Sequence, residues 1–122
     1  MPTTRPQQLT LVYANWCPYC NPLSLERAPL LAERLGVPLR LLDIDDRPAE
    51  RAADALVQEH GDWDPDYLIP QVFLEWTDGS VTHLLTGVPG PMETTRRLWE
   101  LLIAHPEAIA AGGPSARAAR AH

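Results

Sequence analysis

The apolar residues of this chain form short continuous runs that alternate with longer segments in which they recur at helical spacing. The short runs over residues 9–14, 39–44 and 71–76 favour strands, the first two of them buried, because they are too short for helices. A fourth strand is predicted over residues 81–85, because the Asp-Gly pair just before it suits a tight hairpin turn.

Helices are predicted over residues 18–35, 47–60 and 92–105. Gly36 follows the first helix as a terminating residue, and Pro48 fits the first turn of the second. The element order is strand, helix, strand, helix, strand, strand, helix. A strand–helix–strand unit makes its strands parallel, and the hairpin adds an antiparallel pair. We therefore expect an α/β fold, with a four-stranded mixed sheet and three helices on its two faces.

The length of 122 residues suits one domain. We place it at residues 9–106, between a flexible N-terminus at 1–8 and a flexible, Gly- and Pro-broken tail at 107–122. A net charge of −6 without any basic run argues against a nucleic-acid partner. No apolar run approaches the roughly 20 residues that cross a bilayer, and the polar start does not resemble a signal peptide. We expect a cytoplasmic monomer without a membrane partner.

Both cysteines, Cys17 and Cys20, lie just after the first predicted strand, where the first helix should begin. A thiol at a helix N-terminus lies beside unpaired backbone N–H groups and the positive end of the helix dipole, both of which stabilise a thiolate. Cys20 lies one helical turn further along the same side, where it can attack a mixed disulfide formed at Cys17. We therefore interpret Cys17 as the attacking thiol and Cys20 as the resolving thiol, with no cofactor.

Two other interpretations of the cysteine pair remain. A tetrahedral zinc site needs four ligands, whereas this chain has no third cysteine and its four histidines are dispersed. Metal handling within one chain is therefore disfavoured, although a cluster shared between two chains stays open. The pair could also be two unrelated buried thiols, which the helix-start position disfavours.

Four stretches resemble the thioredoxin superfamily in order and spacing, over about residues 9–105: WCPYC, DIDDRPAE, YLIPQVF and DGSVTHLLTGV. The Cys-Pro-Tyr-Cys tetrad is similar to that of glutaredoxins, while the tryptophan before it and the hairpin are more similar to thioredoxins. The resemblance implies a thioredoxin-like fold and a thiol–disulfide oxidoreductase that reduces protein or small-molecule disulfides. An external reductant would then regenerate the Cys17/Cys20 dithiol.

The resemblance also implies a substrate-binding surface made of Trp16, Pro18, Tyr19, Ile69 and Pro70. A cis Ile69–Pro70 bond would face the dithiol and leave the backbone of residue 69 free to pair with an extended substrate. Trp16 is expected to cover the dithiol from the rim, with core packing as its alternative, and Tyr19 to project towards partners. The alternative for Pro70 is an ordinary proline at a strand start.

The chain departs from both relatives at specific places. Leu11 stands where thioredoxins carry a buried acid, and Leu41 stands near the place of its lysine partner. Ala14 stands where glutaredoxins carry a cation that holds glutathione, so the residues argue against glutathione as a partner. Pro22 removes a helical hydrogen bond, so we expect a kink just after Cys20 that leaves unpaired carbonyls near the dithiol.

The segment over residues 60–68 connects the second helix to Pro70. Its two aromatic and three Asp residues could form a lip that selects a cationic or aromatic partner, but we favour a solvated loop with one aromatic residue packed into the core. We expect Trp76 and Trp99 in the core and His83 facing solvent. The alternative function is a partner-binding module with little redox turnover.

Overall fold

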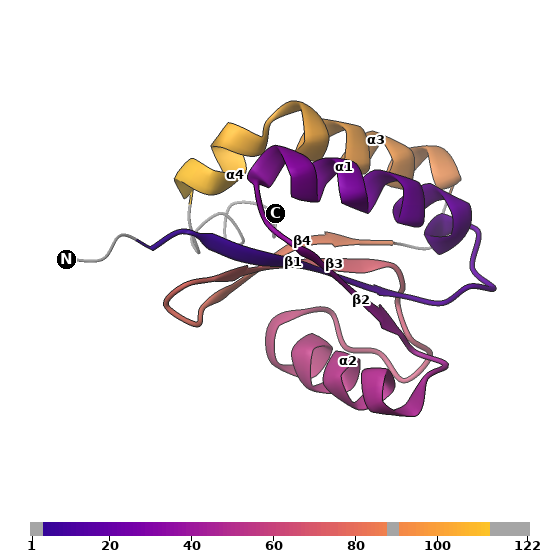
Figure 1. The fold of residues 1–122 in the computed structure, drawn as a ribbon. Helices are drawn as coiled ribbons and strands as arrows, with labels where there is room; N and C mark the ends of the chain where they lie inside the picture. Colours follow the sequence, from indigo (N-terminus) through magenta and orange to yellow (C-terminus); the bar gives the residue numbers. More distant parts are fainter. Residues whose placement is uncertain (1–3, 88–90, 113–122) are drawn as a thin grey trace.

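The computed structural model describes residues 4–87 and 91–112, which form a sheet between two helical layers (Figure 1). In this described part, four strands lie in the order β2-β1-β3-β4. They are β1 (Pro6–Tyr13), β2 (Leu39–Asp43), β3 (Gln71–Trp76) and β4 (Val81–Thr86). β1 pairs parallel with β2 and antiparallel with β3, and β3 pairs antiparallel with β4. The predicted mixed α/β sheet is confirmed.

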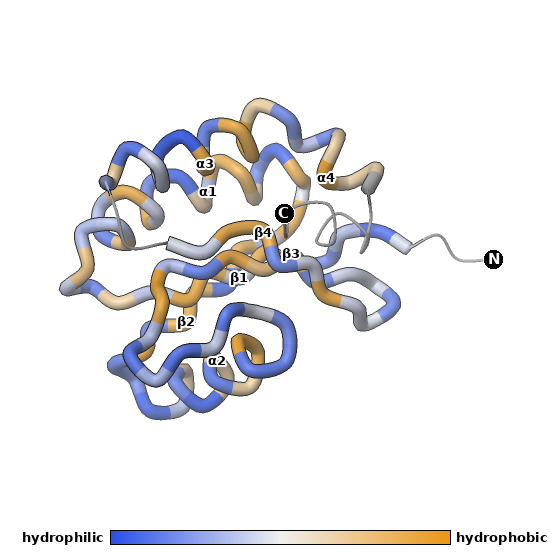
Figure 2. The backbone as a smooth tube through the Cα atoms, turned by 180° about the vertical axis from the view of Figure 1, so that it is seen from behind, coloured by the Kyte–Doolittle hydropathy of each residue, from blue (hydrophilic) through white to orange (hydrophobic). Residues whose placement is uncertain are grey.

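Helices cover both faces of the sheet, as predicted. The helices α1 (Leu25–Leu35), α3 (Met92–Ala104) and α4 (Pro106–Gly112) lie on one face, and α2 (Arg47–His60) lies on the other (Figure 1). Hydrophobic segments follow the central strands, whereas the turns of the outer helices alternate between hydrophobic and hydrophilic (Figure 2). Such alternation is expected of helices that bury one side against a sheet.

Local signals explain where the helices begin and end. The side chain of Asp46 accepts a hydrogen bond from the backbone N–H of Ala49 at 3.2 Å and so caps α2, with Pro48 in its first turn. Helix α1 ends at Gly36, which adopts the left-handed conformation at φ 70°. None of the described helices is long and apolar enough to span a membrane.

The core forms two clusters, one on each face of the sheet. Against α1, α3 and α4 lie Leu9, Leu11, Leu74, Trp76 and Trp99, so both of these tryptophans are in the core as predicted. Against α2 lie Val12, Leu42, Ala53, Val57 and Phe73. Leu11 and Val12 point to opposite faces because successive side chains alternate along a strand.

β1 starts earlier than predicted, so residues 6–8 belong to the sheet and not to a flexible terminus. Pro6 is paired with Trp76, and the N–H of Thr77 donates to the carbonyl of Arg5 at 2.9 Å. The sequence prediction missed this extension because Gln7 and Gln8 carry no apolar signal. Pairing here depends on backbone groups that the adjacent β3–β4 hairpin supplies.

Helix α4 lies partly in the segment 107–122 that we expected to be a flexible tail. Ile109 is only 8% exposed and packs into the core cluster against α1 and α3. One apolar residue among small ones provides no periodic signal, so this helix is stabilised by a tertiary contact that the sequence pattern does not reveal. The remainder of the predicted tail, residues 113–122, lies outside the described residues.

β2 differs from the predicted buried strand because it lies at the edge of the sheet. Leu42 is buried towards α2, whereas Leu41 on the opposite face is 46% exposed. Leu39, on the same face as Leu41, is half-buried against the opposite cluster, so Leu42 is the residue of β2 that is buried in the core.

Candidate active site

The cysteine pair lies just beyond the carboxyl end of β1, in a single turn of helix. The carbonyl of Cys17 accepts hydrogen bonds from the N–H groups of Cys20 at 3.0 Å and Asn21 at 2.8 Å. Pro18 has helical angles of φ −67° and ψ −22° in this turn. Its missing N–H costs nothing at a helix start, which is the place the sequence analysis predicted for it.

The predicted irregularity after Cys20 is confirmed. Asn21 leaves the helical conformation at φ −125° and ψ 111°, and regular helix resumes only at α1. Pro22 has no N–H with which to continue the ladder of hydrogen bonds. The dithiol turn is therefore separated from α1 by a kink.

The expectation of unpaired carbonyls at this kink is wrong for three residues. The hydroxyl of Ser24 donates to the carbonyl of Tyr19 at 2.6 Å. The N–H of Leu25 is directed at the carbonyls of Cys20 and Pro22. Side-chain and backbone donors thus replace the helical bonds that the kink removes, as buried carbonyls require.

The two sulfur atoms differ in their surroundings. Cys17 is partly exposed, whereas Cys20 is 0% exposed, and both are free thiols. The pKa of Cys20 is raised to about 12, mainly by burial. A backbone hydrogen bond from Ala14 lowers this pKa, whereas the charge of Cys17 and a hydrogen bond with it contribute to the rise. Cys20 therefore keeps its proton at neutral pH, with Cys17 as its hydrogen-bond partner.

The turn before β3 lies next to the dithiol. Ile69 belongs to the same apolar cluster as Cys20, and Cys17 packs against that cluster. The Ile69–Pro70 bond is cis, the isomer that the resemblance implied. The end of β4 braces this turn, because the N–H of Gly87 donates to the carbonyl of Pro70 at 2.7 Å.

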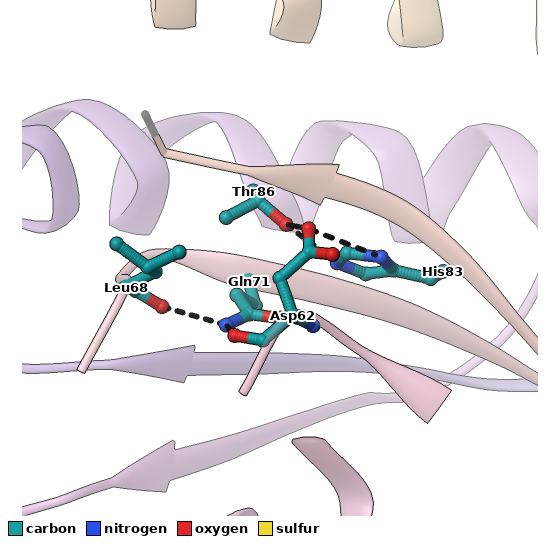
Figure 3. Close-up of polar contacts among 5 residues, drawn as sticks. All are labelled: Asp62, Leu68, Gln71, His83 and Thr86. Atoms are coloured by element: carbon teal, nitrogen blue, oxygen red, sulfur yellow. Dashed lines mark hydrogen bonds and ion pairs between the residues drawn. The ribbon is translucent and has the colours of Figure 1, made fainter. Parts of the chain in front are cut away.

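Gln71 ties the connecting loop to the start of β3 (Figure 3). Its buried amide group donates to the carbonyls of Asp62 at 3.0 Å and Leu68 at 2.8 Å. The same amide accepts from the N–H of Asp62 at 3.1 Å. One side chain thus holds both ends of the loop beside the Ile69–Pro70 turn. No sequence signal pointed to this role, because glutamine is common on surfaces.

His83 is buried, so the prediction that it faces solvent is wrong. It is 1% exposed and stacks on Phe73 with ring centroids 4.9 Å apart. Its Nε2 atom lies 2.8 Å from the hydroxyl of Thr86, which donates to Asp62 at 2.6 Å, as Figure 3 shows. His83 is paired with Phe73, and the carboxylate of Asp62 lies 3.8 Å from its Nδ1 atom, so the connecting loop shields this face of β4 from solvent.

Two tryptophans near these elements are exposed, Trp16 by 65% and Trp63 by 45%. Core packing of Trp16 is therefore excluded. Tyr67 contacts Trp63 edge-on at 5.8 Å between ring centroids, packs against the cluster of Cys20, and donates its hydroxyl proton to Asp54. This matches the favoured interpretation of a solvated loop with one aromatic residue packed inwards. Pro18 is exposed and Tyr19 is partly buried.

The fold is defined by three features: the parallel pair β1 and β2, the antiparallel β3–β4 hairpin, and the Cys-x-x-Cys turn that lies beside an Ile-Pro turn. The chain has a thioredoxin-like fold. No protein-family model and no curated protein matches it. Among solved structures it is similar to the C-terminal domain of Neisseria meningitidis DsbD in the reduced form, with 21% identity, 80% coverage of each chain and a TM-score of 0.42.

Within residues 4–87 and 91–112, no group of three or more His, Cys, Asp or Glu side chains is arranged to hold a metal ion.

Proposed function

We propose that this protein is a thiol–disulfide oxidoreductase that reduces disulfides of proteins or small molecules through Cys17 and Cys20. The observation that carries the proposal is that the two thiols differ in exposure to solvent and that the buried thiol keeps its proton. Cys17 is partly exposed, while Cys20 is buried with its pKa raised to about 12. One sulfur is accessible to a substrate, and the second is held beside it to complete the reaction.

In the first step, the thiolate of Cys17 attacks one sulfur of the substrate disulfide. A bond forms between Cys17 and that sulfur, the substrate disulfide breaks, and the other substrate sulfur leaves as a thiolate that takes up a proton. The product of this step is a mixed disulfide at Cys17.

In the second step, Cys20 loses its proton and attacks the sulfur of Cys17. The Cys17–Cys20 disulfide forms, and the second substrate sulfur leaves as a thiol. The negative charge on Cys17, which raises the pKa of Cys20, is absent once Cys17 is in a mixed disulfide, so this loss of a proton becomes easier. The substrate has gained two electrons, which an external dithiol reductant must restore to the protein.

Substrate binding is proposed at the surface around Cys17. The backbone of Ile69 would pair with an extended segment of the substrate, and Trp16, Pro18 and Tyr19 would contact its side chains. Ala14 is fully buried and carries no charge, which supports a dithiol reductant over glutathione.

The test is equilibration of the purified protein in glutathione or dithiothreitol redox buffers of graded potential. We expect a reversible two-electron couple that forms the Cys17–Cys20 disulfide, at about −200 to −230 mV if the tetrad behaves as in glutaredoxins. Cys17→Ser and Cys20→Ser should each abolish the couple. If the wild-type protein shows no reversible couple, the proposed function is wrong.

A second candidate is a partner-binding module with little redox turnover. The 65% exposure of Trp16 beside the dithiol favours it, because exposed aromatic side chains are frequent in binding surfaces. Insulin reduction separates the candidates. Equal activity of the wild type and Cys17→Ser would support binding alone, whereas loss of activity in Cys17→Ser supports the oxidoreductase.

A further inference from the structure

A buried chain of hydrogen bonds connects α3 to the dithiol turn. The indole N–H of Trp99 donates to the hydroxyl of Ser24 at 2.9 Å, and this hydroxyl donates to the carbonyl of Tyr19 at 2.6 Å. Ser24 and Trp99 are both 0% exposed, so water does not compete for these bonds. A hydroxyl has one proton, and here it is directed at Tyr19, while the indole satisfies the oxygen.

The kink removes the α-helical hydrogen-bond partner of the Tyr19 carbonyl. In a regular helix it would accept a backbone N–H four residues further on, but Asn21 is extended at φ −125° and ψ 111°. The side chain of Ser24 supplies the donor instead. The carbonyl of Tyr19 and the nitrogen of Cys20 belong to the same peptide group. The hydrogen bond from Ser24 therefore restrains the orientation of the backbone at Cys20.

We propose that Ser24, oriented by Trp99, is a positioning residue that holds the sulfur of Cys20 within reach of Cys17. The inference rests on the proposed function, because it concerns the second step at the same dithiol. Without the hydroxyl, the carbonyl of Tyr19 and the indole N–H of Trp99 both lose a buried partner. The peptide group before Cys20 is then held on its N–H side, by the bond to the carbonyl of Cys17, and loses the bond on its carbonyl side.

The experiment follows the reaction of the reduced protein with 5,5′-dithiobis(2-nitrobenzoate), which releases one coloured thiolate in each step. The first phase reports attack by Cys17, and the second reports attack by Cys20 on the mixed disulfide. For Ser24→Ala we expect an unchanged first phase and a second phase slowed by about tenfold or more, as misplaced reacting atoms imply.

A matched control lies at the opposite end of the sheet. The indole N–H of Trp76 donates to the buried hydroxyl of Thr82 at 2.8 Å, which is a bond of the same type. Thr82→Val should lower thermal stability to a similar extent and leave the second phase unchanged. A merely structural role of Ser24 predicts the same result for Ser24→Ala.

The outcomes separate the two hypotheses. A wild type without a second phase contradicts the proposed function. A wild type with two phases, together with a second phase of Ser24→Ala at the wild-type rate, overturns only the positioning role. If Ser24→Ala does not fold, Trp99→Phe decides, because it keeps an aromatic ring in the core and removes the indole N–H together with part of the ring system. A slower second phase in Trp99→Phe supports the proposal, and an unchanged one overturns it.

Discussion

At the scale of single residues, the two cysteines carry the same group and differ in their contact with solvent and in their hydrogen bonds. Burial of Cys20 disfavours its charged form, which is the first cause of its raised pKa. Leu11 on β1, where thioredoxins have an acid, is fully buried and has no group that could take up a proton. Leu11 therefore cannot accept the proton that Cys20 loses in the second step.

This burial predicts how the stability of the reduced protein depends on pH. The pKa of Cys20 is raised from 9.0 to about 12, so above pH 9.0 the unfolded chain releases a proton that the folded chain keeps. The free energy of unfolding should then fall by up to about 1.4 kcal/mol per pH unit, whereas below that pH the contribution is constant.

The measurement is urea unfolding under reducing conditions from about pH 8 to about pH 10.5, where this linkage operates. Cys20→Ala lacks the contribution, so its stability should fall less steeply. Burial also raises the pKa of Tyr13 and Tyr67, and the difference between the two proteins isolates Cys20 from them. If the free energy of unfolding falls equally steeply with pH in the wild type and in Cys20→Ala, the raised pKa of Cys20 is contradicted.

At the scale of elements, the end of β4 determines the position of the turn that precedes β3. A side chain at Gly87 would place its Cβ 2.5 Å from Cδ of Pro70 and 2.7 Å from the carbonyl oxygen of Ile69. Such contacts require the backbone to move. Only glycine lets β4 approach closely enough for the hydrogen bond with Pro70.

Gly87→Ala should therefore lower the free energy of unfolding by about 2 kcal/mol or more and slow disulfide reduction, because overpacking displaces the turn. Gly36→Ala is the control. Gly36 has φ 70°, and a Cβ added there would meet no atom within 4 Å, so we expect only about 1 kcal/mol of backbone strain and normal activity. Urea unfolding and insulin reduction measure both. Equal losses in the two variants would refute the bracing role of Gly87.

At the scale of the whole molecule, α4 closes the core on the face away from α2. Ile109 packs in the cluster that also holds Trp99, so the chain beyond α3 contributes to the folded domain. The dithiol lies beside the other core cluster, against which Cys17 packs. A substitution in α4 should therefore change the free energy of unfolding without changing the redox potential of the dithiol.

Ile109→Ala should lower the free energy of unfolding by about 2 kcal/mol through lost burial and a cavity. The redox potential of the dithiol should stay at the wild-type value. Leu101→Ala is the matched control, because this side chain is 53% exposed and should cost below about 1 kcal/mol. Urea unfolding and redox titration check both. A stable Ile109→Ala variant would show that α4 does not hold the core together.

Local patterns determined much of this protein. Strand and helix positions, the helix boundaries at Gly36 and Pro48, the dithiol after β1 and the kink at Pro22 all depend on residues a few positions apart. Apolar periodicity and proline geometry act over such distances, so they are visible in the sequence. The order of elements then predicted a mixed sheet with a parallel pair of strands and an antiparallel hairpin, whereas the strand order came from the structure.

The tertiary structure alone decided the contacts between distant segments. Phe73 and the connecting loop bury His83, Ile109 stabilises α4 by its packing in the core, and Gly87 is required by Pro70. Ser24 resembles any helix-start serine until Trp99, 75 residues away in the chain, is brought to its hydroxyl. Such partners leave no periodic trace, because hydrogen bonding and packing depend on distance in space and not on spacing in the sequence.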